Sequence, residues 1–123
     1  MLFRSTDFLR AVDEIKRRFH PDVLLIEPTG IGSLSLILSS LSKGAGDGVS
    51  LAPPVTVVDA ESFGDYIEVF GEFYRDQIAG AATLVVTKSK ALPSEERDAV
   101  LRALADMNPK AGIVLPSYAE LPH

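Results

Sequence analysis

Short apolar runs alternate with longer amphipathic stretches along this chain. In the amphipathic stretches apolar residues recur at helical spacing, as with Phe8, Val12 and Phe19, on a helix that ends at His20-Pro21. The short apolar runs cover residues 23–27, 55–59, 83–87 and 111–115. Runs of this length, bounded by turn residues, are typical of buried parallel strands. The alternation predicts an α/β fold of three layers, a mostly parallel sheet with helices on both faces.

The ends of the helices carry recognisable signals. Ser5 or Thr6, Ser33 and Ser94 are each placed to cap the start of a helix, and Asn108-Pro109 stops the last one. The third helix, residues 63–78, contains Gly71, which predicts a kink or a split. Its aromatic residues keep the helical period and are expected in the core, although partly exposed aromatic residues would instead mark a partner surface.

Composition narrows the class of protein. The 123 residues carry a net charge of −5, and 46% of them are hydrophobic, so we expect a single domain over residues 1–123 with a core of its own. The negative charge argues against binding to nucleic acid or to anionic membranes. Without cysteine, and with only His20 and His123, no zinc site is expected. No apolar run approaches the ~20 residues of a membrane span, so a cytoplasmic protein is expected.

Candidate chemistry lies where the strands end. Glu27 closes the first apolar run, and Gly30 follows three positions later. Ligands of parallel sheets bind at the carboxyl edge, where a carboxylate can hold a metal-bound water and a backbone N–H can meet a phosphate oxygen. Alternatively, Glu27 is simply solvated, and Gly30 serves a turn that needs positive φ. Asp59, at the end of the second strand, fits a cap of the following helix better than a ligand site.

The glycine-rich segment 44–48 is not a phosphate loop by its context. No predicted strand leads into it, and no Lys-Ser or Lys-Thr pair opens a helix after it. We therefore expect a flexible loop there.

Three segments, in this order and spacing, resemble a known family. They are LLIEPTG at 24–30, PVTVVDA at 54–60 and LVVTKSK at 84–90, and they are similar to the CobW/HypB/UreG family of metal-handling P-loop GTPases, the CobW branch above all. The resemblance covers residues 19–115 and implies the C-terminal part of a nucleotide-binding domain. It implies catalytic positions at Glu27 and Gly30 and nucleotide-binding positions at Thr87, Lys88, Lys90 and Ser117, while the composition leaves no residue assigned as a metal ligand.

Two departures from the family pattern qualify these roles. The sequence contains no GxxxxGK(S/T) phosphate-binding loop, and the cysteine-rich metal motif is absent as well. The base-recognition motif should read Asn/Thr-Lys-x-Asp, but Lys90 occupies the aspartate position. An aspartate accepts two hydrogen bonds from guanine, whereas lysine only donates, so preference between guanine and adenine stays open.

The resemblance implies that the intact protein binds GTP and Mg²⁺ and serves metal-ion delivery or the assembly of cobalamin or another metalloenzyme cofactor. We expect these residues alone to be inactive and to hold no cofactor. Expected partners are a P-loop segment or a client metalloprotein, with a homodimer as a further option. The alternative is a non-catalytic α/β interaction or signalling module that has lost nucleotide binding.

Two expectations concern the sheet itself. Because each closes a strand or follows one directly, Glu27, Asp59, Lys88 and Ser117 should lie along one edge of it. The backbone of residues 23–26 should be paired by another chain or by internal rearrangement, because an apolar strand edge without lysine or proline invites pairing.

Overall fold

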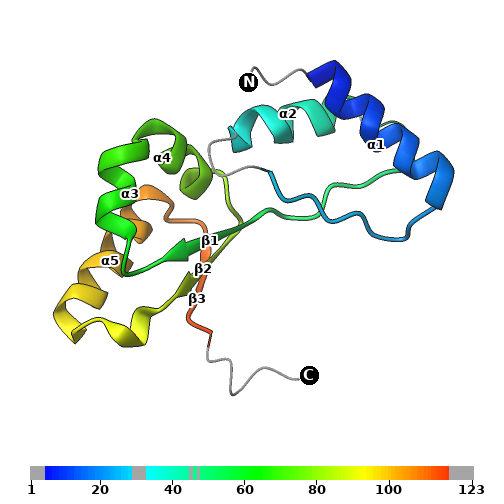
Figure 1. Cartoon of the computed structure of the whole chain (residues 1–123). Coiled ribbons are helices and arrows are strands. Elements are labelled where there is room, and N and C mark those ends of the chain that lie inside the picture. The colour runs from blue at the N-terminus through cyan, green and yellow to red at the C-terminus, as the bar shows by residue number, and fades with distance from the viewer. Residues whose placement is uncertain (1–4, 29–32, 45, 47, 117–123) are drawn as a thin grey trace. The chain divides into compact units, whose positions relative to one another are not determined.

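The computed structural model describes residues 5–28, 33–44, 46 and 48–116. Its elements are α1 (Ser5–Phe19), α2 (Leu34–Gly44), β1 (Val55–Asp59), α3 (Phe63–Phe70), α4 (Glu72–Ala79), β2 (Thr83–Thr87), the 3-10 turn η1 (Ser89–Ala91), α5 (Ser94–Met107) and β3 (Gly112–Val114) (Figure 1). The chain divides into two compact units, Met1–Ala52 and Pro53–His123, which are described separately.

In the first unit, α1 and α2 pack through the buried side chains of Val12, Ile37 and Leu41. His20, with φ of 46°, ends α1, and its N–H donates to the carbonyl of Lys16 at 3.1 Å. The hydroxyl oxygen of Ser33 accepts the Leu36 N–H at 3.4 Å, as a helix cap does. Both helices and the Ser33 cap are therefore confirmed.

The strand predicted at residues 23–27 is wrong. This segment belongs to no helix or strand and pairs with no other strand among the described residues. The side chains of Val23 and Leu25 are 83% and 91% exposed. An apolar run becomes a strand only where a neighbour supplies its backbone hydrogen bonds, and the described residues provide no such neighbour. Internal re-pairing is thus not seen there, and closure by another chain stays a prediction.

The second unit contains a parallel sheet in the order β1-β2-β3. Val55 lies opposite Thr83 and Asp59 opposite Thr87, while Leu84 lies opposite Ile113. The bounds predicted for β1 and β2 are confirmed, and β3 is shorter than predicted. The core joins one face of this sheet to α3, α4 and α5 through Val58, Ala60, Phe63, Tyr74, Ile78, Ala81, Leu84, Val86 and Leu104.

The three helices of this unit lie on the same face of its sheet (Figure 1). When strands follow one another in spatial order, crossovers of one hand place their helices on one side. Side chains therefore alternate along β1, with Thr56 and Val58 buried and Val55 and Val57 59% and 64% exposed. The α/β class is confirmed, whereas the second helical layer expected over the sheet is not found among the described residues of this unit.

The third predicted helix is split at Gly71, as expected. Gly71 has φ of 49° and ψ of −114°, a conformation suited to glycine. Its N–H donates to the carbonyl of Ile67 in α3, and its own carbonyl accepts the N–H of Arg75 in α4. Both distances are 3.1 Å. Of the aromatic residues, Phe63 and Tyr74 are buried as predicted, while Tyr66, Phe70 and Phe73 are partly exposed.

Asn108 does more than stop α5. Its side-chain N–H groups donate to the carbonyls of Ile78 and Ala81, both at 2.8 Å, and its Oδ1 accepts the Ala111 N–H at 3.2 Å. One buried amide thus ties the end of α4 to the entrance of β3. The predicted Ser94 cap is wrong by one position, because Pro93 occupies the cap position and its carbonyl accepts the Arg97 N–H at 2.9 Å.

Candidate functional site at the carboxyl ends of the strands

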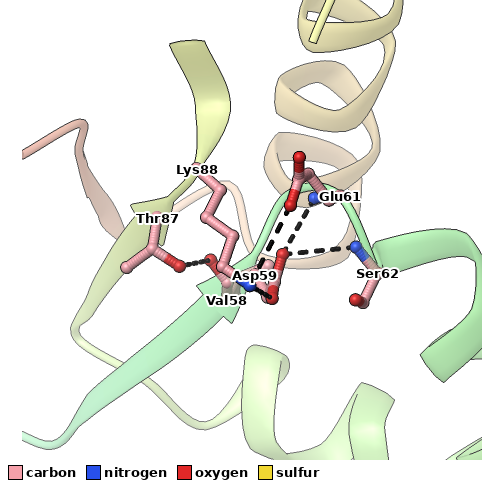
Figure 2. Close-up of polar contacts among 6 residues, drawn as sticks. All are labelled: Val58, Asp59, Glu61, Ser62, Thr87 and Lys88. Carbon is pink, nitrogen blue, oxygen red and sulfur yellow. Dashed lines mark hydrogen bonds and ion pairs between the residues drawn. The ribbon is translucent and has the colours of Figure 1, made fainter. Parts of the chain in front are cut away.

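The carboxylate of Asp59 organises the loop that follows β1. Its Oδ1 accepts the N–H groups of Glu61 and Ser62 at 2.9 and 3.3 Å (Figure 2). This is an Asx-type turn, in which an aspartate side chain substitutes for a backbone acceptor. The prediction that Asp59 caps the following helix is therefore wrong, because Ser62 holds the cap position of α3 and Asp59 instead binds the loop that precedes it.

The other oxygen of Asp59 binds Lys88, the residue that follows β2. Lys88 Nζ donates to Asp59 Oδ2 at 2.7 Å and lies 3.9 Å from Glu61 Oε2 (Figure 2). The Lys88 side chain is 56% exposed and that of Asp59 22%. The Lys88 backbone is left-handed, with φ of 59° and ψ of 16°, which is uncommon for a residue other than glycine.

Both partners of this ion pair are held in their charged forms. The hydrogen bond from Lys88 lowers the pKa of Asp59, and the N–H groups of Ser62 and Glu61 lower it further against the opposing effect of burial. The same hydrogen bond, with the negative charge of Asp59, raises the pKa of Lys88. The edge therefore presents an Asp59–Lys88 ion pair, with the side chain of Glu61 3.9 Å from the lysine Nζ.

Two further residues, Thr87 and Tyr74, belong to the region around Asp59. The Thr87 hydroxyl donates to the carbonyl of Val58 at 3.3 Å and so links β2 to β1 (Figure 2). The Tyr74 hydroxyl is buried and has no hydrogen-bond partner among the described residues. Burial, and secondly the negative charge of Asp59, raises the pKa of Tyr74 to about 12, so this phenol remains a protonated donor at neutral pH.

The predicted site residues are brought together only in part. Thr87 and Lys88 lie beside Asp59 at one edge, and Lys90 follows in η1 with an exposed side chain. Gly30 and Ser117 lie outside the described residues. Glu27 is exposed and belongs to the other unit. The shared edge is therefore seen for Asp59 and Lys88, while the roles assigned to all these residues stay predictions.

Sequence reasoning missed Glu61 and Tyr74 as members of this region. Glu61 follows a strand end by two positions, and Tyr74 belongs to the aromatic series of the third helix. Nothing in the sequence distinguishes either residue from its neighbours as a member of a site. In the described part of the chain, no group of three His, Cys, Asp or Glu side chains could hold a metal ion. The described helices are also too short or too polar to cross a membrane.

Comparison with known proteins agrees with the α/β fold. The family model for the CobW/HypB/UreG nucleotide-binding domain matches residues 3–115. The chain is 32% identical, over 92 residues, to the zinc chaperone YeiR of Escherichia coli K12, a match that covers 74% of this chain and 28% of YeiR. No solved structure matches the chain significantly. The chain therefore belongs to the CobW/HypB/UreG family of nucleotide-binding, metal-handling proteins.

Proposed function

We propose that this chain supplies the base-facing part of the nucleotide-binding domain in a CobW-like GTP-binding protein. The observation that carries the proposal is Lys88, which stands at the carboxyl end of β2 with its stem accessible and its ammonium bound to Asp59. The family match supports the nucleotide as ligand. GTP binding and hydrolysis with Mg²⁺ would then drive delivery of a metal ion to a client metalloprotein in the cytoplasm.

The metal delivered is proposed to be zinc, because the E. coli relative is a zinc chaperone. The match spans 28% of that relative, so this inference concerns a protein larger than the matched segment. Assembly of cobalamin or another metalloenzyme cofactor is the second pathway that the family resemblance suggests.

Each candidate residue has a proposed part in this domain. The aliphatic stem of Lys88 would support the base, with Thr87, Lys90 and Ser117 flanking it. Glu27 would act near Mg²⁺ or the attacking water, and the Gly30 N–H would approach the γ-phosphate. When bound, Mg²⁺ supplies charge neutralisation at the phosphates.

The residues present fit the base side of such a site better than the phosphate side. These 123 residues include no GxxxxGK(S/T) loop, and that loop provides most phosphate contacts in P-loop enzymes. We therefore propose that this chain alone neither holds GTP tightly nor hydrolyses it, and that a P-loop segment is its partner.

Calorimetric titration with GTP tests both halves of the proposal. The chain alone should show no binding at micromolar nucleotide, and the chain joined to a family segment that carries GxxxxGK(S/T) should bind. The same segment with its own C-terminal half serves as the positive control. Stoichiometric low-micromolar binding by the chain alone would overturn the dependence on a partner. Absence of binding in the joined protein, with the control active, would overturn the base-facing role.

A non-catalytic interaction module is the second candidate, and two observations favour it. Lys90 replaces the acceptor that guanine needs. Phe70 and Phe73 leave 38% and 51% of their surface exposed at the break between α3 and α4. Failure of the joined protein to bind GTP would favour this candidate.

A further inference from the structure

One carboxylate joins the two loops that follow β1 and β2. Asp59 Oδ1 accepts two backbone N–H groups of its own loop, and Asp59 Oδ2 accepts the Lys88 ammonium from the loop after β2. Lys88 is 29 positions away in sequence. We propose that Asp59 is the positioning residue for Lys88: it fixes the lysine stem across the strand ends, where, on the proposed function, the base of the nucleotide would lie.

The geometry makes Asp59 suitable for this task because its own orientation is fixed. The bonds from Glu61 and Ser62 restrain the carboxylate plane, which sets the direction in which Oδ2 accepts. Its side chain is 22% exposed, much less than that of Lys88. A charge-assisted hydrogen bond of 2.7 Å to such a fixed acceptor restrains the free end of a long side chain.

Lys88 is thereby restrained at both of its ends. Its backbone takes the left-handed conformation that closes the turn into η1, and its Nζ is bound by Asp59. The stem runs from the end of β2 toward the end of β1 (Figure 2). A stem held in this way offers an apolar strip to a planar ligand. Its ammonium, already paired with Asp59 and near Glu61, would contribute little to binding phosphate.

The competing interpretation is an ordinary surface ion pair without consequence for Lys88. Exposed pairs contribute little to stability, so a stability measurement alone would not separate the two interpretations. The test must therefore observe the lysine itself. Asp59→Asn is the informative variant, because the amide Oδ1 still accepts the loop N–H groups while the charge is removed.

NMR of the lysine side chains in the full chain provides this observation. In Asp59→Asn we expect the pKa of Lys88 to fall and exchange of its ammonium protons to accelerate about tenfold, since a charge-assisted hydrogen bond is lost. The Glu61 and Ser62 amides should remain as protected as in the wild type. Glu61→Gln is the matched control: it removes the same charge from the same loop, 3.9 Å from Nζ, and should change exchange by less than about twofold.

The positioning role is overturned if Asp59→Asn leaves Lys88 exchange within about twofold of wild type, or if Glu61→Gln has the larger effect. A second measurement connects the role to the ligand. In the chain joined to a P-loop segment, Asp59→Asn should weaken GTP binding about tenfold and Glu61→Gln much less. Equal GTP affinity in Asp59→Asn and wild type would overturn the link to the base. If wild type binds no GTP while Asp59→Asn still frees Lys88, the proposed function fails and the positioning role stands.

Discussion

Replacing Asn108 by alanine should strongly destabilise the second unit. The Asn108 side chain is 7% exposed and makes hydrogen bonds of 2.8, 2.8 and 3.2 Å to Ile78, Ala81 and Ala111. Each such bond contributes about 1 kcal/mol, and leaving its buried partner unsatisfied costs about 1–3 kcal/mol. A loss of roughly 3 kcal/mol is therefore expected, which lowers the melting temperature of a unit this small by on the order of 15 °C.

Urea and thermal unfolding followed by circular dichroism would measure this loss. Asp106→Ala, an exposed change in the last turn of the same helix, is the matched control and should stay within about 0.5 kcal/mol of wild type. Asn108→Asp keeps an acceptor for Ala111 but turns a charge toward two carbonyls, so it should destabilise at least as much as alanine. A loss below about 1 kcal/mol in Asn108→Ala would refute the inference that this amide holds α4, α5 and β3 together.

Three further predictions concern the backbone, a buried phenol and pH. Gly71→Ala should destabilise the folded chain by about 1 kcal/mol, because φ is 49° there. Gly64→Ala, in open space on α3, should stabilise it by about 0.5–1 kcal/mol through helix propensity. Urea unfolding of both variants distinguishes backbone strain from helix propensity. Tyr74→Phe should be neutral or slightly stabilising, since it removes a buried hydroxyl without a described partner, and loss of stability in thermal unfolding would reveal a partner. The pKa of Asp59 is lowered in the folded state, so the stability it contributes relative to Asp59→Asn should be present above its ordinary value of 3.8 and vanish as pH falls through the folded value. Because the pKa of Lys88 is raised, its contribution should persist up to 10.5 and be lost only as pH rises beyond it; acid and alkaline unfolding series measure both limits.

The sequence pattern located β1 and β2 to the residue because their apolar runs are bounded by turns and find partners nearby in the chain. The same pattern gave a wrong prediction at residues 23–27. An apolar run indicates that its side chains favour burial, but it does not identify the strand or helix that would bury them. Strand-end logic also anticipated that Asp59 and Lys88 share an edge. Their hydrogen bond could not be anticipated, since it depends on the left-handed turn at Lys88 and on the way the Asp59 loop orients its carboxylate.

Two departures from the expected fold have a common physical origin. Val23 and Leu25 are exposed and pair with no strand among the described residues, and Val55 and Val57 are exposed on the face of the sheet opposite α3, α4 and α5. Parallel sheets are almost always covered on both faces, and burying apolar surface gains roughly 25 cal/mol for each Å². These four side chains therefore represent favourable burial that the described residues do not realise. A segment that pairs with residues 23–26, or one that covers this face of the sheet, would gain that burial. On the proposed function, a complementary part of a nucleotide-binding domain would be such a segment.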